Sequence, residues 1–162
     1  MDLRRRPRRL RRTAGLRALV RETRLSPDQF VYPLFVCEGA GVRKAVSSMP
    51  GVFQLSVDEA VKEAQAARAD GVGAVLLFGL PAAKDAEGSA AWDPQGPVPR
   101  AVRAMVAGIP DLTVITDVCL CEYTEHGHCG VLDGERILND PTVERLVRSA
   151  ICLLYTSPSP RD

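Results

Sequence analysis

The stretch "LSVDEAVKEAQAARADGVGAVLLFG", residues 55–79, predicts a helix that is followed at once by a strand. Its first part carries an apolar stripe at helical spacing, formed by Val57, Ala60, Val61, Ala64 and Ala67. Ser56 and Glu59 have the spacing of a capping box, and Gly71 is placed to end the helix. The run 73–79 is apolar on both faces, which is typical of a buried parallel strand. A helix leading directly into such a strand indicates a crossover unit.

The same alternation continues on both sides of this stretch. "FVYPLFVCEG" predicts a strand at Val31–Cys37, although Pro33 inside it cannot donate to a ladder. A helix is expected at 98–107 and a third strand at 112–120, "LTVITDVCL". A last helix is expected to be capped by Asn139 or Asp140, with Pro141 in its first turn. Strands that alternate with helices at intervals of about 40 residues predict an α/β fold with a parallel sheet.

Charge divides the chain into two parts. Residues 1–24 carry ten arginines against Asp2 and Glu22, so the rest of the 162-residue chain is net −7. This pattern predicts a basic arm, residues 1–29, that docks on a partner, and a core body, residues 30–150. No run approaches the ~20 apolar residues of a membrane span, and the start lacks the apolar region of a secretory signal. Asp2 and the scarcity of serine argue against a mitochondrial transit peptide, so we expect a cytoplasmic protein.

The last twelve residues, 151–162, do not continue the pattern. "ICLLYTSPSPRD" interrupts the polar–apolar rhythm of the preceding helix and then becomes rich in proline and serine. We expect this segment to be foreign to the native sequence, such as read-through of an adapter or vector. The alternative is an ordinary frayed C-terminus.

The stretch "DVCLCEYTEHGHCG", residues 117–130, holds the residues best suited to chemistry. Cys119 and Cys121 are two apart at the end of the third predicted strand, so their side chains should share one face. Cys129 can return to them because Gly127 and Gly130 allow the intervening loop to fold back. Three thiolates around one ion favour zinc, whereas five cysteines clustered in this way do not suggest a disulfide framework.

The number of protein ligands distinguishes a catalytic zinc from a structural one. Catalytic zinc keeps one position open, whereas structural zinc is closed by a fourth protein ligand, for which His126 and His128 are candidates. A redox pair of Cys119 and Cys121 is a further alternative. Asp117 lies two residues before Cys119, where its carboxylate can orient a ligand, hold substrate or move a proton.

The stretch "VITDVCLCEYTEHGHCG" closely resembles the zinc-binding segment of the porphobilinogen synthase (delta-aminolevulinic acid dehydratase) family. The resemblance covers almost all of residues 4–150, including "LLFGLP", "KDAEGSAAWDPQGPVPRAVRA" and "NDPTVERLVRSA". It implies a (β/α)8 TIM barrel, mainly octameric, whose N-terminal arm wraps a neighbouring subunit. It also implies a hydro-lyase that condenses two 5-aminolevulinate molecules into porphobilinogen in haem and other tetrapyrrole biosynthesis.

The resemblance also implies roles for individual residues. Cys119, Cys121 and Cys129 would bind a catalytic Zn²⁺, which places the chain in the zinc-dependent branch of the family. Asp117 would line the active site, and His128 would support the site without binding the metal. Zinc would act as a Lewis acid on the second substrate molecule or its water.

The chain departs from the family pattern in its lysines. The family forms Schiff bases through two lysines, and neither Lys44, Lys62 nor Lys84 matches those motifs. Lys44 is expected in the loop after the first strand, Lys62 on the outer face of a helix, and Lys84 in a mobile loop after the second strand. A (β/α)8 barrel takes ~250 residues, so this chain is expected to be only its N-terminal part, with about three βα units. Alone it should be inactive and aggregation-prone.

One rival hypothesis comes from the arginines. Ten arginines in 24 residues would also suit phosphate contacts in a zinc-stabilised nucleic-acid-binding module. The acidic body and the absence of a second Cys/His pair of finger type argue against it. We therefore expect 5-aminolevulinate and further copies of the chain as partners, and neither nucleic acid nor a membrane.

Overall fold

The computed structural model of the chain describes residues 6–156. Five strands form one sheet, and a separate pair of short strands precedes the last helix. The strands are β1 (Val31–Cys37), β2 (Arg43–Ala45), β3 (Phe53–Ser56), β4 (Ala74–Leu80), β5 (Thr113–Thr116), β6 (Leu132–Asp133) and β7 (Arg136–Ile137). The helices are η1 (Pro7–Arg11), α1 (Ala14–Leu19), η2 (Pro27–Gln29), α2 (Val57–Ala69), η3 (Ser89–Trp92), α3 (Pro97–Gly108) and α4 (Asn139–Leu154), where η marks a 3-10 helix.

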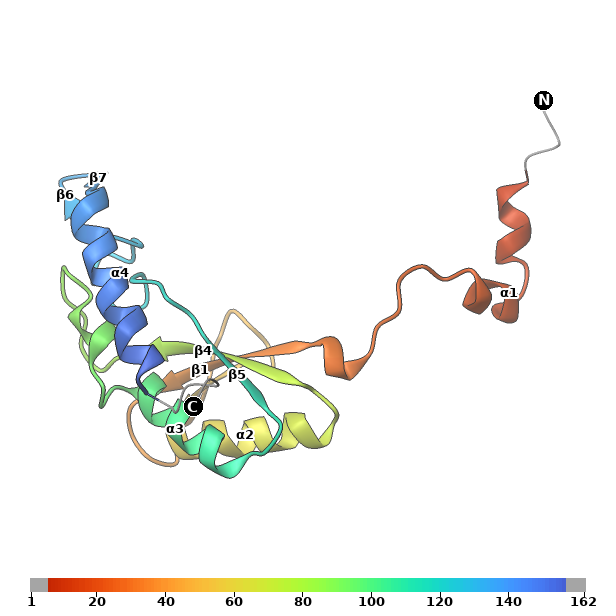
Figure 1. The fold of residues 1–162 in the computed structure, drawn as a ribbon, viewed down its shortest axis with the longest axis horizontal. Helices are drawn as coiled ribbons and strands as arrows, with labels where there is room; N and C mark the ends of the chain where they lie inside the picture. The colour runs from red at the N-terminus through yellow and green to blue at the C-terminus, as the bar shows by residue number, and fades with distance from the viewer. Residues whose placement is uncertain (1–5, 157–162) are drawn as a thin grey trace.

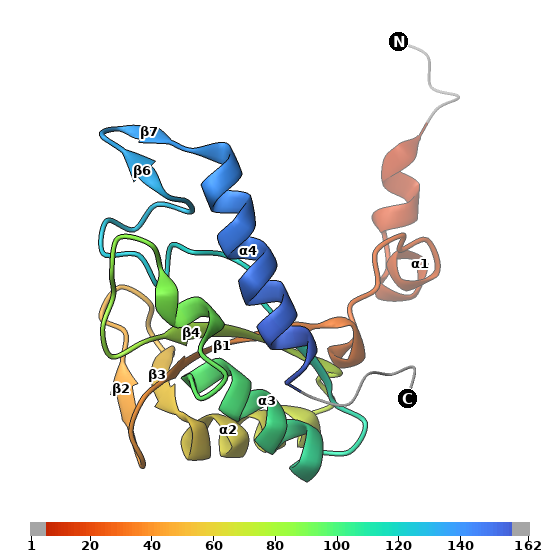
Figure 2. The ribbon, with the colours of Figure 1, turned by 60° about the vertical axis from the view of Figure 1, so that its left-hand side comes forward.

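The sheet has the strand order β2-β3-β1-β4-β5. Strands β1, β4 and β5 are adjacent and run parallel. The chain passes from β1 to β4 through α2 and from β4 to β5 through α3. Figures 1 and 2 show these two helices side by side against the sheet. The predicted α/β fold with a parallel sheet is confirmed. The short strands β2 and β3 were not predicted. Strand β3 pairs in parallel with β1, on the side away from β4.

The first strand has the predicted bounds despite its proline. Along its whole length β1 pairs with β4, from Val31 opposite Ala74 to Cys37 opposite Leu80. On its other side only the last three residues pair with β3. Pro33 therefore lies where β1 has a single neighbour, and a strand tolerates a missing N–H there.

One face of the sheet forms the core. Alternate residues of β1 and β4 are buried against α2 and α3, and their cluster includes Leu34, Val36, Val75, Leu77 and Met105. The other face of β4 is only half-buried, although its residues are equally apolar. On that face Phe35 and Phe78 stack with ring centroids 5.5 Å apart. The prediction that the strand is covered on both faces is thus met on one face only.

The start of α2 differs from the predicted capping box. The Ser56 hydroxyl makes no cap bond to the helix; it accepts from the Val42 N–H at 2.9 Å and donates to Asp58 at 2.5 Å. Glu59 binds Lys62 at 2.5 Å instead of reaching back to the cap. The carboxylate of Asp58 also accepts from the Gly41 N–H, and the Ser56 bond, followed by the Gly41 bond, lowers its pKa. Ser56 thus joins the helix start to the loop after β1.

Glu63 on α2 joins the helix to the sheet. It accepts hydrogen bonds from the Tyr32 hydroxyl at 2.9 Å and from Arg43 at 2.7 Å. The Arg43 bond, more than the Tyr32 bond, holds the pKa of Glu63 below its usual value. A lowered pKa in the folded state gives stability that is present above the unfolded value, near ~4.3, and is lost as pH falls through the folded value.

We expect Glu63→Gln to lower the free energy of unfolding at pH 7 by roughly 0.5–1 kcal/mol, because solvent screens much of this pair. Urea unfolding between pH 3 and pH 7 measures the effect. The wild-type chain should lose stability as pH falls below about 4.5, and the variant should lose less. Glu135→Gln, on the exposed β6–β7 turn, is the control for removing one charge. Identical pH profiles for the wild-type chain and Glu63→Gln would contradict the assignment.

The described part of the basic arm extends away from the sheet over residues 6–26 (Figure 1). Thr13 caps α1 by accepting from the Leu16 N–H at 3.2 Å, and Leu19 of this helix is 78% exposed. The end of the arm is fixed at η2, which packs on the turn between α2 and β4. A side chain at Gly73 would lie 2.9 Å from the Asp28 carbonyl oxygen, so only glycine allows this close approach.

The last helix, α4, begins one residue earlier than predicted and has a different cap. Leu138 occupies the N-cap position, so the expectation that Asn139 or Asp140 caps the helix is wrong. The Thr142 hydroxyl donates to the Leu138 carbonyl at 2.6 Å and accepts from the Val131 N–H at 3.0 Å. The helix continues to Leu154, into the segment expected to be foreign, and residues 157–162 lie outside the described residues. None of the helices in the described part of the chain is long and apolar enough to span a bilayer.

Candidate metal site

The cysteine segment leaves the sheet earlier than the sequence predicts. Strand β5 ends at Thr116, so Cys119 and Cys121 do not lie on a strand and the argument from a shared strand face is wrong. A turn at Leu120 brings the two side chains together instead. The Leu120 carbonyl accepts from the N–H groups of Tyr123 and Thr124, both at 2.9 Å, and the Leu120 side chain is fully buried. The two sulfur atoms are 3.4 Å apart.

Cys129 completes a cluster of three sulfur atoms. The sulfurs of Cys119, Cys121 and Cys129 all lie within 4.8 Å of one another. Cys119 and Cys121 are half-buried, and Cys129 is on the solvent side. The cluster stands at the carboxyl end of the parallel strands, the edge at which α/β folds bind ligands. Three thiol donors in one place suit a thiophilic divalent metal ion.

The pKa values of the Cys121 and Cys129 thiols are both raised. Burial is the largest cause that raises the pKa of Cys121, followed by hydrogen bonding to Cys119 and Glu122. The pKa of Cys129 is raised mainly by its hydrogen bond to Cys119. A bound cation reverses this balance, because it deprotonates a coordinating thiol. The chemistry of the cluster therefore fits a cation site.

Two carboxylates stand beside the sulfurs. Oxygen atoms of Asp117 and Glu122 lie within 4.8 Å of the Cys119 sulfur and of one another. Glu122 also accepts from the Cys121 thiol at 3.3 Å. Asp117 follows β5 directly, and its N–H donates to the Leu77 carbonyl of β4 at 3.3 Å. Asp117 was singled out from the sequence, whereas Glu122 was missed, although its position next to Cys121 was an available signal.

The histidines are turned to other partners. The Nδ1 atom of His126 accepts from the His128 N–H at 3.2 Å, so its Nε2 carries the proton, and this atom lies 3.3 Å from the Ala86 carbonyl oxygen. His128 is exposed, with its ring 5.6 Å from that of His126. Among residues 6–156, no histidine nitrogen belongs to the sulfur cluster. The supporting role of His128 stays a prediction.

The three lysines belong to three different segments of the chain. Lys44 lies on the short strand β2 and not in a loop as predicted, and its side chain is exposed. Lys62 is on the outer face of α2, where the hydrogen bond to Glu59 raises its pKa. Lys84 is exposed in the segment after β4.

Tyr123, two residues after Cys121, reaches from the cysteine loop to the sheet. Burial, more than the nearby carboxylates of Glu122 and Asp117, raises the pKa of its hydroxyl. Its ring reaches β4 at Gly79, where an added Cβ would overlap the Tyr123 hydroxyl oxygen and lie 2.9 Å from its Cζ. Gly79 therefore leaves the space that Tyr123 occupies. This contact could not be predicted from the sequence.

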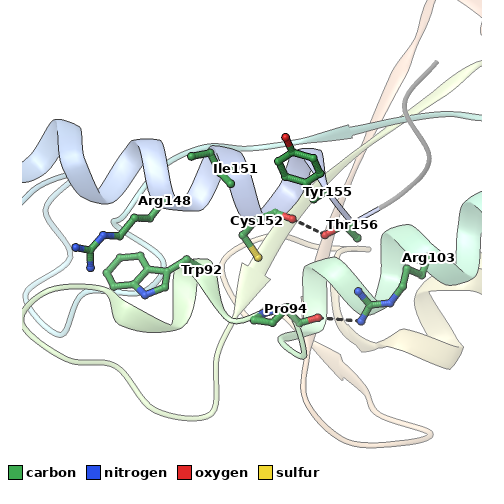
Figure 3. A pocket seen from close by; sticks show the side chains of 8 residues that line it. All are labelled: Trp92, Pro94, Arg103, Arg148, Ile151, Cys152, Tyr155 and Thr156. Atoms are coloured by element: carbon green, nitrogen blue, oxygen red, sulfur yellow. Dashed lines mark hydrogen bonds between the residues drawn. The ribbon is translucent and has the colours of Figure 1, made fainter. Parts of the chain in front are cut away.

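A pocket of about 380 Å³ lies elsewhere, between η3, α3 and the end of α4 (Figure 3). Arg103 donates to the Pro94 carbonyl at one side of it, and Arg148 lies over the Trp92 ring, 5.8 Å from its centroid. Half of its lining comes from residues 151–156, within the segment expected to be foreign. None of the three clustered cysteines lines it.

Comparison with known proteins identifies the family to which the chain is similar. The family model for delta-aminolevulinic acid dehydratase matches residues 4–156. The delta-aminolevulinic acid dehydratase of Halalkalibacterium halodurans is 52% identical over 146 residues, covering 90% of this chain and 44% of the relative. That of Synechocystis is 51% identical over 150 residues, covering 90% and 46%. That of Methanothermobacter thermautotrophicus is 52% identical over 149 residues, covering 90% and 45%.

A solved structure has the same fold over the described chain. It is the delta-aminolevulinic acid dehydratase (porphobilinogen synthase) of Toxoplasma gondii in complex with the reaction product porphobilinogen, with a TM-score of 0.89 and 35% identity. The match covers 96% of this chain and 45% of that one. The parallel βα units thus form part of the predicted barrel fold.

The matches cover most of this chain but less than half of each of these relatives. The chain spans about half the length of the curated relatives it matches, between 44% and 46% of the three described above. The family model continues six residues beyond Ala150, the predicted end of the native sequence. Because this model matches nearly the whole chain, the protein belongs to the delta-aminolevulinic acid dehydratase family.

Proposed function

We propose that this chain is the zinc-binding part of a porphobilinogen synthase, a hydro-lyase that condenses two molecules of 5-aminolevulinate into porphobilinogen for tetrapyrrole biosynthesis. The observation that carries the proposal is the three-sulfur cluster at the carboxyl end of the parallel strands, in a chain of this family. The Schiff-base lysines of the reaction are expected in the portion of its relatives that the chain does not span.

Cys119, Cys121 and Cys129 would hold the metal, and Zn²⁺ is the ion that best suits three thiolates. The ring nitrogens of His126 face backbone groups, which supports a site with three protein ligands and one open position. When bound, zinc supplies a Lewis acid that polarises an oxygen atom of the substrate or of water.

Asp117 is the candidate catalytic residue. Its backbone is fixed to β4 by the bond to Leu77, and its carboxylate lies beside the Cys119 sulfur. From there it can hold the ammonium group of a substrate and accept a proton from it. Glu122 has a carboxylate oxygen within 4.8 Å of the Cys119 sulfur and would add to the attraction for a bound cation.

The proposal includes the assembly and location of the full-length protein. An octamer held by the basic arm would agree with the exposed Leu19 and with residues 6–26 lying apart from the sheet (Figure 2). A cytoplasmic location is expected for this activity. Nucleic-acid binding by the arm is the rival hypothesis, and the family assignment weighs against it. Binding of generic DNA that weakens steeply with salt would favour the rival.

A chimera tests the activity. Residues 4–150 of this chain replace the matching segment of the Halalkalibacterium halodurans enzyme, and porphobilinogen formation from 5-aminolevulinate is measured. We expect an active chimera whose activity falls by at least ~100-fold with Cys121→Ser, because catalysis needs the metal. The isolated 162-residue chain should form no product. An inactive chimera that folds and binds zinc, or rapid turnover by the isolated chain, would contradict the proposal.

A further inference from the structure

The segment after β4 folds around the carboxylate of Asp85. This carboxylate accepts from the N–H groups of Glu87 at 2.9 Å and Ser89 at 3.0 Å, and from the Ser89 hydroxyl. These bonds, with the Ser89 hydroxyl first, lower the pKa of Asp85 and keep it charged. Hydrogen bonds to a charged acceptor are about twice as strong as neutral ones. The Asp85 side chain therefore stabilises the turn formed by residues 85–89.

The backbone of this turn is bonded to the loop between Cys121 and Cys129. The Asp85 N–H donates to the Tyr123 carbonyl at 3.4 Å, and the Asp85 carbonyl accepts from the Glu125 N–H at 3.0 Å. The next carbonyl, of Ala86, accepts from the His126 ring at 3.3 Å. The cysteine loop thus has three hydrogen bonds to the backbone of the Asp85 turn, two through its own backbone and one through the His126 ring, within the stretch that returns the chain to Cys129.

The other side of the turn is held by the body of the protein. Glu87 pairs with Arg145 of α4 at 3.2 Å, and the Ser149 hydroxyl of α4 donates to the Ala91 carbonyl at 3.2 Å. Gly88 has a φ of +70°, and a side chain there would meet Thr124 at 3.3 Å. The segment that the sequence suggested to be mobile is therefore bonded on both sides.

We propose that Asp85 is a positioning residue for the metal site. By folding its own turn it presents two carbonyls and one N–H that hold residues 123–126, and so place Cys129 within reach of Cys119 and Cys121. The proposal rests on the metal site proposed above. Loss of groups that orient metal ligands typically weakens metal binding by 10–100-fold. We expect Asp85→Ala to raise the dissociation constant for Co²⁺ by at least ~10-fold.

The test is a Co²⁺ titration of the 162-residue chain, followed by the thiolate-to-cobalt absorption band. Asp85→Asn is the conservative variant: its amide oxygen can keep the bonds from Glu87 and Ser89, so it should bind within a few-fold of wild type. Asp93→Ala is the matched control, because Asp93 caps a similar turn through Gln95 at 2.8 Å without a hydrogen bond to the cysteine loop. Asp93→Ala should bind Co²⁺ like the wild-type chain.

Amide hydrogen exchange supplies a second measurement. In Asp85→Ala the Glu125 amide should exchange faster, whereas the Thr113 amide, which donates to Gly73 in the sheet, should keep its protection. If Asp85→Ala unfolds, Ser89→Ala removes only the hydroxyl bond, and it should weaken Co²⁺ binding about threefold and speed Glu125 exchange.

The outcomes separate the two proposals. A wild-type chain that binds no Co²⁺ overturns the proposed metal site itself. If the wild-type chain binds, wild-type affinity in a folded Asp85→Ala or Ser89→Ala variant overturns the role of Asp85 and leaves the metal site intact. Equal weakening by Asp93→Ala, or unchanged Glu125 exchange, overturns that role as well.

Discussion

Cys121→Ser is expected to weaken Zn²⁺ binding by at least ~100-fold, because a hard hydroxyl replaces one of only three thiol donors. Cys121 stands 3.4 Å from the sulfur of Cys119 and accounts for the contact with Glu122. Its loss leaves two sulfurs, of which that of Cys129 is on the solvent side. Competition with a chromophoric chelator measures the affinity, and metal analysis should fall from one zinc per chain to nearly none.

Cys37→Ser is the matched control. Cys37 is also half-buried and lies at the end of β1, outside the sulfur cluster. Its replacement should leave zinc binding unchanged. A Cys121→Ser chain that keeps one tightly bound zinc would contradict the metal site. Zinc binding that survives loss of Cys129 would instead favour a dithiol of Cys119 and Cys121.

Gly79→Ala is expected to lower the free energy of unfolding by about 1–3 kcal/mol, the usual cost of adding a methyl group where there is no space. The new Cβ would overlap the Tyr123 hydroxyl and lie 3.0 Å from Val98 in α3. Because Tyr123 lies two residues after Cys121, its displacement should also weaken metal binding. Urea unfolding followed by circular dichroism measures the first effect, and Co²⁺ titration the second.

Two variants test the cause of this loss. Gly108→Ala at the end of α3 adds the same methyl group where no atom lies within 4 Å, so it should be nearly neutral. Tyr123→Leu removes the hydroxyl and the Cζ atom, so the double variant with Gly79→Ala should lose less stability than the two single variants added together. Strict additivity would mean that Gly79 and Tyr123 do not compete for space.

Local patterns predicted the regular elements well. The apolar runs of β1 and β4 and the helical stripe of α2 are strong local signals, and the packing of one sheet face on two helices agrees with them. The end of β5 was not predictable in this way. "LTVITDVCL" stays apolar beyond Thr116, but the buried side chain of Leu120 starts a turn there, and burial of that residue depends on contacts distant in sequence.

In the candidate site, too, local sequence predicted some features, and others depend on contacts distant in sequence. The type and spacing of Cys119, Cys121 and Cys129 were enough to predict that their sulfur atoms lie together, although the strand geometry assumed for the first two was wrong. The contributions of Asp85, Gly79 and Tyr123 could not be predicted, because they come from separate segments that only the fold brings to the cysteine loop. The predicted capping box of α2 was wrong for a similar reason, because the Ser56 hydroxyl bonds to the N–H of Val42 in the loop after β1.

The pairing of β1 with β4 also affects the order of events during synthesis. Val31 must find Ala74, which the ribosome adds only after α2 has been made. At ~5–20 residues per second this leaves the apolar β1 segment without its neighbour for several seconds. An unpaired apolar strand invites association with other nascent chains. The ten arginines that precede it give every such chain the same positive charge, so mutual repulsion protects β1 until β4 emerges.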